Sequence, residues 1–208
     1  MNKTTLRQFI KDLMNRTDLT DSLIDSYMEI SFQYIQRDLR LPNMERQTSF
    51  TGANAGGTES FLIPNDYLEA IAVIRKDSSG NDKVVNRKTI ADFYNYDTSS
   101  TQNIYTRLRS SLLMRPVVAQ NETFSMLYYG PLTFFASDSD EPALASFAPD
   151  LIAYQTCSYL CDYYVDERMQ LFQQRADIAV QKLMAQNESE EMKGGLFQMS
   201  TPYAGSEY

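Results

Sequence analysis

The spacing of apolar residues changes twice along this chain, and that change limits the fold more than any single motif does. Near the N-terminus the apolar residues recur at the spacing of one helix face, at Leu6, Phe9, Ile10 and Leu13. Between residues 46 and 130 the pattern becomes the alternation of strands, and from residue 151 helical spacing returns. We therefore expect an α+β fold, mainly α, in which a small antiparallel β domain is inserted into a helical bundle.

Residues 1–45 are expected to contain two helices. Thr5 and Gln8 have the spacing of a capping box, which predicts the start of the first helix. Thr20 is expected to cap a second helix, which ends before Pro42 because proline cannot continue the helical hydrogen bonds. Since a short polar turn joins the two, this segment is predicted to be an N-terminal helical hairpin.

Residues 46–135 are expected to form the β insertion. Runs of apolar and β-branched residues predict strands at residues 60–63, 68–74, 104–108, 112–114 and 124–129. A turn at residues 78–81 leads into Val84 and Val85 and predicts one hairpin, and a turn near Ser110 predicts a second. Thr89–Tyr94 is predicted to be a short helix.

Residues 136–191 are expected to supply the other two helices of the bundle. An acidic linker over residues 136–149 precedes Asp150, which is predicted to cap a helix that extends to about Val165. That helix is apolar nearly all round, which is typical of a central helix. Asp166 is expected to cap a last long helix, so two N-terminal and two C-terminal helices make up the predicted bundle.

The last segment, residues 192–208, differs from the rest of the chain. Small and polar residues separate large apolar ones, which are Leu196, Phe197, Met199, Tyr203 and Tyr208. The segment is too short to build a core, yet disordered tails are usually poor in large apolar residues. We therefore expect an extended C-terminal arm that becomes ordered when it binds a partner.

The composition excludes several classes of function. The chain has no histidine, which rules out Ser-His-Asp and Cys-His catalysis. Cys157 and Cys161 share a helix face, but alone they cannot complete a zinc site, so we expect buried structural thiols. The N-terminal segment lacks the apolar core of a signal peptide, and the apolar runs fall far short of the ~20 residues that span a bilayer. We expect synthesis in a cytoplasm, no membrane contact, no metal and no cofactor.

Acidic charge is concentrated in the C-terminal third. Residues 131–208 hold 12 acidic and 4 basic residues, and the whole chain has a net charge of -8. The excess of acidic residues therefore lies entirely in this part of the chain. A surface that holds DNA needs clustered basic residues that displace the counterions of the phosphates. We expect the C-terminal third to repel DNA.

Clustered carboxylates suggest two kinds of chemistry, each with a simpler interpretation. Asp138, Asp140 and Glu141 could bind calcium, but they lack the glycine and the distant glutamate of an EF-hand loop, so a solvated acidic linker is the favoured interpretation. Glu59 and Asp66 could be the paired carboxylates of a glycosidase. Such pairs occur in every acidic protein.

Two further clusters lie in the β insertion. Arg107, Arg109 and Arg115 lie on one predicted hairpin and either contact phosphate or form ordinary ion pairs on a solvent face. Residues 51–58, TGANAGGT, form a glycine-rich loop that lacks the lysine of a phosphate-binding loop. This loop is either a flexible hairpin tip or a docking loop.

Four segments, taken in order, resemble one known family. They are FLIPNDYLEAIAVIR (Phe61–Arg75), LLMRPVV (Leu112–Val118), MLYYGPLTFF (Met126–Phe135) and EPALASFAPDLIAYQTCSYLCDYY (Glu141–Tyr164). Together with the N-terminal helical hairpin, they resemble the head-to-tail adaptor proteins of short-tailed bacteriophages, from about Leu6 to about Ala185. The resemblance lies in the order and spacing of the segments.

The resemblance implies a structural virion protein without enzymatic activity. Members of this family form a homo-oligomeric ring, usually dodecameric, beneath the portal protein of the filled capsid. They extend the DNA channel, through which DNA passes without sequence-specific binding, and they offer a platform for the tail. The location implied is the head–tail interface of the virion.

The resemblance also assigns roles to two groups of residues. It implies that a C-terminal arm binds the portal, through Leu196, Phe197, Met199, Pro202 and Tyr203. It implies that a loop of the β insertion faces the next tail component, a tube or nozzle protein, through Gly52, Asn54, Gly56 and Gly57. The alternatives are a virion-associated, carboxylate-dependent cell-wall hydrolase and a non-viral interaction module of helical-bundle type.

Overall fold

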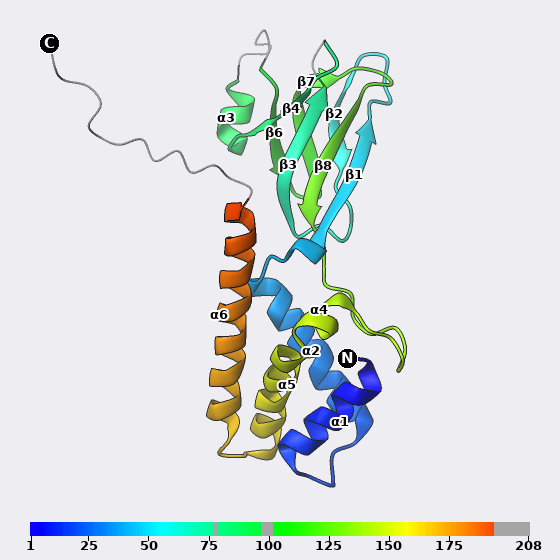
Figure 1. Cartoon of the computed structure of the whole chain (residues 1–208). Helices are drawn as coiled ribbons and strands as arrows, with labels where there is room; N and C mark the ends of the chain where they lie inside the picture. The colour runs from blue at the N-terminus through cyan, green and yellow to red at the C-terminus, as the bar shows by residue number, and fades with distance from the viewer. Residues whose placement is uncertain (77–78, 97–101, 194–208) are drawn as a thin grey trace, which may run out of the picture. The chain divides into compact units, whose positions relative to one another are not determined.

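The computed structural model describes residues 1–76, 79–96 and 102–193, and it has an α+β fold. The chain divides into two compact units (Figure 1). The helical unit comprises the described residues 1–39 and 133–193, and the β unit comprises the described residues of 40–132. The expected α+β class is confirmed, whereas the bundle arrangement and the four predicted segments (1–45, 46–135, 136–191 and 192–208) stay predictions.

The helical unit is organised around one apolar helix. Its helices are α1 (Lys3–Met14), α2 (Asp21–Asp38), α4 (Ala143–Phe147), α5 (Pro149–Tyr164) and α6 (Met169–Lys193). Helix α5 contacts α1, α2 and α6, and its residues Leu151, Ile152 and Leu160 are fully buried. Helix α5 is apolar nearly all round because neighbouring helices cover it on several sides, as the sequence predicts for a central helix. Within the described residues, no helix is long and apolar enough to cross a membrane.

Helix starts were predicted with mixed success. Thr20 caps α2 as expected, because its hydroxyl accepts a hydrogen bond from the Leu23 N–H at 3.3 Å. The predicted capping box of α1 is wrong: Asn2 is the cap, its side chain accepts from the Thr5 N–H at 2.9 Å, and Thr5 lies inside the helix. Asparagine caps helices as well as threonine does, so the earlier start adds a turn.

The return from the β unit contains two further differences. Asp150 is not the cap of α5, because Pro149 already occupies the first helical position and Asp150 lies in the first turn. The fixed backbone angle of proline favours that position. The expected linker also contains the five-residue helix α4. Helix α6 begins at Met169, and the Arg168 N–H donates to the Asp166 side chain at 3.0 Å.

The β unit consists of two four-stranded sheets. The first has the order β1-β8-β3-β4 and the second β2-β7-β6-β5. The strands are β1 (Glu45–Thr51), β2 (Thr58–Leu62), β3 (Glu69–Lys76), β4 (Asp82–Val84), β5 (Asn86–Arg87), β6 (Ile104–Leu108), β7 (Ser111–Val118) and β8 (Thr123–Tyr129). Both predicted hairpins are confirmed, since β3 pairs with β4 and β6 pairs with β7, each antiparallel. The pairing of β5 with β6 is parallel and was not expected.

One hydrophobic core joins the two sheets. Phe61, Leu112 and Met114 from the second sheet pack in the same cluster as Phe124 and Met126 from the first. The sheets therefore face each other as in a sandwich, with alternate residues pointing inward. The predicted short helix is confirmed as α3 (Ile90–Tyr94), capped by Thr89, and a 3-10 turn (Pro42–Met44) precedes β1.

Candidate interaction site

The glycine-rich loop between β1 and β2 lies beside the turn between β7 and β8, at one end of the β unit (Figure 1). The Gly52 N–H donates to the Glu122 carbonyl oxygen at 2.9 Å, and the Asn121 N–H donates to the Gly52 carbonyl oxygen at 2.9 Å. Strands β1 and β8 remain paired up to Thr51 and Thr123. The two connections are therefore joined at their bases, and we call residues 52–57 with 119–122 the loop end.

The interior of the glycine-rich loop is ordered by Thr58. Its hydroxyl oxygen accepts from the Ala53 N–H at 3.0 Å and from the Asn54 N–H at 3.3 Å. The Gly57 N–H donates to the Asn54 carbonyl oxygen at 2.9 Å, and Gly57 has a φ of +89°, which suits glycine. Gly52 is buried, whereas residues 53–56 are exposed. The loop thus presents a short exposed tip on a fixed base, which suits docking better than free movement does.

Gly52 is required by the close approach of two backbones. A Cβ atom at this position would lie 2.1 Å from the Ala119 carbonyl oxygen and 2.9 Å from that of Val118. Real Cβ atoms do not approach backbone oxygens so closely, so a side chain would push the two connections apart.

Gly52→Ala is therefore expected to lower the free energy of unfolding by about 1–3 kcal/mol, the usual cost of overpacking. Gly56→Ala is the matched control, because a Cβ there would meet nothing within 4 Å and the change is expected to stay within about 0.5 kcal/mol. Denaturant unfolding of both variants measures the difference. Equal effects would show that the contact between the two connections does not hold the loop.

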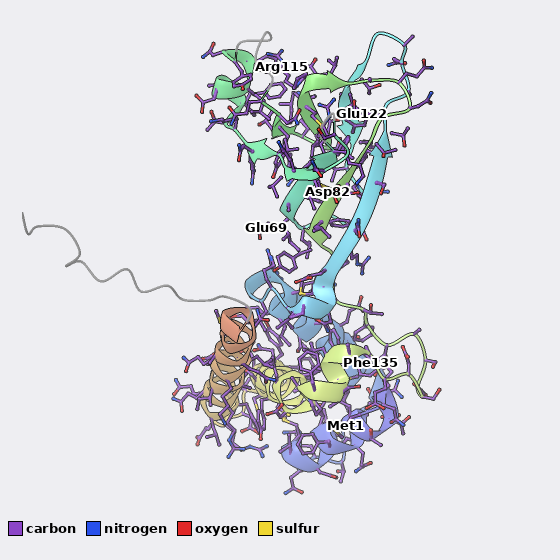
Figure 2. All side chains as sticks on the ribbon, turned by 45° about the horizontal axis from the view of Figure 1, so that its top comes forward. Met1, Glu69, Asp82, Arg115, Glu122 and Phe135 are labelled. Carbon is purple, nitrogen blue, oxygen red and sulfur yellow. The ribbon has the colours of Figure 1, made fainter. Side chains whose placement is uncertain are left out.

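Arg75 supports the loop end from inside the β unit. Its guanidinium donates from Nε and from one Nη to the two carboxylate oxygens of Glu122, the residue labelled in Figure 2, at 2.6 and 2.7 Å. The other Nη donates to the Pro116 carbonyl oxygen at 2.9 Å. Glu122 in turn accepts from the Ala119 N–H at 3.0 Å. The hydrogen bonds from Arg75 hold the pKa of the Glu122 carboxyl below its ordinary value. One buried cation therefore fixes the turn that holds the glycine-rich loop.

Comparison with known families decides what kind of protein carries this loop end. The family model described as SU10 adaptor protein matches residues 1–198. The chain belongs to the SU10 adaptor protein family. The match confirms the resemblance to phage head-to-tail adaptors and supports a structural role. A search of curated proteins finds no match to the adaptor.

The two candidate catalytic carboxylates of the adaptor are engaged in separate ion pairs. Glu59 accepts from Arg115 Nε at 2.9 Å. Asp66 pairs with Arg46 and accepts from the Tyr128 hydroxyl at 3.1 Å. Each carboxylate thus serves a local structural contact, and the geometry gives no support to a glycosidase pair, which needs one free acid and one free base or nucleophile.

Two of the three hairpin arginines, Arg107 and Arg115, also have internal partners for their guanidinium groups. The Arg115 guanidinium lies 4.7 Å from the ring centre of Phe93 and donates to its carbonyl oxygen at 3.0 Å. The Arg107 guanidinium lies 4.8 Å from the ring centre of Tyr67 and donates to the Arg109 carbonyl oxygen at 3.1 Å. These contacts favour a packing role over phosphate binding.

The acids of the linker are fixed rather than only solvated. Asp138 pairs with Arg7 at 2.9 Å, and Glu141 pairs with the ammonium group of Met1, the residue labelled in Figure 2. Asp140 accepts from the Ala136 N–H at 2.9 Å. Among the residues that the structure describes, no group of three acids or cysteines is arranged to hold a metal. The linker is therefore attached to the N-terminal helix by ion pairs, and the calcium hypothesis gains no support.

The two cysteines are buried thiols, as the sequence predicts. Cys157 and Cys161 are free and buried in α5. Burial raises the pKa of the Cys157 thiol from its ordinary value of 9.0 to about 12 and that of Cys161 to about 11. Such thiols are poor nucleophiles, which agrees with a structural role.

The sequence analysis missed part of the site, and another part lies outside the described residues. Arg75, Glu122 and the turn at residues 119–122 were not singled out, although the AQNET run between two strands is a turn signal. The predicted arm residues Leu196, Phe197, Met199, Pro202 and Tyr203 lie outside the described residues.

Proposed function

We propose that this adaptor forms a ring of about twelve copies beneath the portal, joins the phage head to the tail and extends the DNA channel. The observation that carries the proposal is the family match over residues 1–198, which extends from the first helix into the last segment. It supports the phage adaptor role, and the ring, the portal contact and the channel are the finer parts of the proposal.

Three parts of the chain are proposed to supply the surfaces that such a role needs. The exposed tip at residues 53–56 is proposed to contact the next tail component, because a tip on a fixed base loses little entropy on binding. The apolar residues of the segment 192–208 are proposed to form the arm that binds the portal. The acidic C-terminal third is proposed to face the channel, where like charge keeps DNA from adhering.

The rival function is a virion-associated cell-wall hydrolase that uses carboxylates. Glu59 and Asp66 were its strongest candidates, and both are held by arginines. Clearing of a cell-wall suspension that a single Glu59→Gln change abolishes would favour the hydrolase. The adaptor is expected to leave the suspension turbid.

Co-sedimentation with the portal ring encoded by the same genome tests the proposed function. The full chain is expected to sediment with the portal ring and to remain in the supernatant without it. Failure to bind the portal would contradict the adaptor role, whatever the fold.

A further inference from the structure

The outer side of α6 carries apolar residues that no described residue of the helical unit covers. Leu171 and Ile178 are 45% and 50% exposed, and Arg175 and Lys182 are exposed as well. The four residues follow one another at intervals of four, three and four positions, so they share one face of the helix. The buried side of the same helix is a different one, with Phe172, Ala176 and Ala179. We call the exposed row the α6 stripe.

Helices α2 and α5 carry a second surface, which is made of tyrosine rings instead of aliphatic and cationic side chains. The ring of Tyr159 packs against those of Tyr27 and Tyr34, with both pairs of centres 6.4 Å apart, and the ring of Tyr27 lies 6.0 Å from that of Tyr163. Tyr163 is 56% exposed, and Ile30 on α2 is also exposed. This tyrosine face is continuous, partly open to solvent and rich in the residue type most enriched in protein interfaces.

The corner after α5 adds a strained residue to this side of the unit. Val165 has a φ of +54° and a ψ of +46°, a left-handed conformation that β-branched residues avoid. Glycine is the usual residue at this position after a helix. The valine side chain is 91% exposed, so it gains no packing within the chain that would offset the strain. Strain without an internal benefit is typical of a residue that acts on a partner.

We propose that the α6 stripe of one copy packs against the tyrosine face and Val165 of the next copy, which makes a head-to-tail contact between identical chains. This inference rests on the proposed ring and identifies the surfaces that would join its copies. Contacts in a ring are heterologous, so one chain must carry two different complementary patches.

The chemistry of the two surfaces favours a contact between the α6 stripe and the tyrosine face over a contact between two tyrosine faces. Tyrosine rings attract arginine and lysine side chains through their electron-rich faces. The stripe offers Arg175 and Lys182 between and beside its two aliphatic residues. The exposed carboxylate of Asp162, next to Tyr163, adds negative charge to the tyrosine side. Arg175 already lies over the Tyr154 ring of its own chain, 5.6 Å from the ring centre, so Lys182 is the cation that two tyrosine faces packed together would leave outside the contact.

Cross-linking on the portal ring tests the contact. Tyr163→Cys and Ile178→Cys variants of the full chain are mixed, assembled on portal and treated with a short bis-maleimide. The native cysteines are buried and have raised pKa values, so they react slowly. A cross-linked dimer is expected from the mixture and from neither variant alone. Gln170→Cys replaces Ile178→Cys in the control, since Gln170 lies about 12 Å nearer the start of α6, at 1.5 Å per residue.

The outcomes separate this contact from the proposed function. A dimer formed by Tyr163→Cys alone would show that two tyrosine faces meet, which overturns the proposal. Sedimentation with the portal but no cross-link from the mixture would also overturn it and would leave the adaptor role intact. Absence of portal binding by the unaltered chain would contradict both the proposed function and the proposed contact between copies.

A second variant guards against loss of folding. Val165→Gly is expected to raise the midpoint of unfolding, because glycine adopts the left-handed conformation without strain. It is expected to weaken assembly on the portal about tenfold, because the apolar area that the valine side chain would bury against the next copy is lost. A more stable chain that assembles less well is an outcome that damage to the fold cannot produce. Unchanged assembly would contradict the proposed contact.

Discussion

Replacement of Arg75 with alanine is expected to lower the free energy of unfolding of the β unit by about 1.5–3 kcal/mol, because it removes the charged donor from a partly buried ion pair whose Glu122 side chain is 28% exposed. Arg75 is 7% exposed, and its guanidinium satisfies the Glu122 carboxylate and the carbonyl oxygens of Pro116 and Val117. Without it, those groups lose their donor in a largely buried place. Denaturant unfolding measures the loss, and amide hydrogen exchange of β3 and β8 assigns it to the β unit.

Lys76→Ala is the matched control for this prediction. Lys76 is the next residue on the same strand and pairs with Asp82 at 2.8 Å, but both side chains are mostly exposed. Exposed pairs contribute about 0–1 kcal/mol, so this variant is expected to be nearly as stable as the unaltered chain. Equal losses in the two variants would refute the special role of Arg75.

The same ion pair predicts how the effect depends on pH. The pKa of Glu122 is lower in the folded chain than in the unfolded chain, chiefly because Arg75 donates hydrogen bonds to it. A lowered carboxyl pKa contributes stability that is complete above the unfolded pKa and is lost as pH falls through the folded pKa. The difference between the unaltered chain and Arg75→Ala is therefore expected to narrow in acid.

Truncation after Met192 is expected to abolish co-sedimentation with the portal ring. The removed segment carries the apolar residues Leu196, Phe197, Met199 and Tyr203. Buried apolar and aromatic anchors in interfaces are often worth about 2 kcal/mol or more each, so the loss of two of them weakens binding by roughly 1000-fold. The helical unit is expected to unfold at the same denaturant concentration with and without the segment.

A full-length variant tests whether portal binding depends on the side chains of the arm or only on the presence of the segment. Serine at all four anchor positions is expected to reproduce the truncation. Alanine at Gln198 and Ser200, which lie between the anchors, is expected to leave binding unchanged. Portal binding by the truncated chain would assign the contact to another surface, with the helical unit as the next candidate.

The periodic parts of the fold could be predicted from the sequence. Thr20 could be predicted to cap α2 because a threonine directly before a segment with helical apolar spacing is a common signal of a helix start. The hairpins were evident because β3, β6 and β7 are rich in apolar residues and are followed by turn residues. Strand β1 was not evident, because ERQTSFT is a polar edge strand whose formation depends on β8, a partner far away in the sequence.

The candidate site was only half predictable for a similar reason. The glycines of residues 52–57 predict a loop, but they do not indicate that Gly52 is packed against Ala119. Arg75 looks like the charged end of an apolar strand, and its partners Pro116 and Glu122 lie 41 and 47 residues further along the chain. Local sequence specifies turns and periods, whereas a buried ion pair depends on which strands become neighbours.

The mass of the complex between the portal ring and the full chain tests the central claim most directly. Native mass measurement of the portal ring, alone and with excess adaptor, counts the 23.9-kDa chains that bind. The proposed function predicts one discrete complex that has gained a full ring of about twelve chains. A portal ring of unchanged mass would contradict the account.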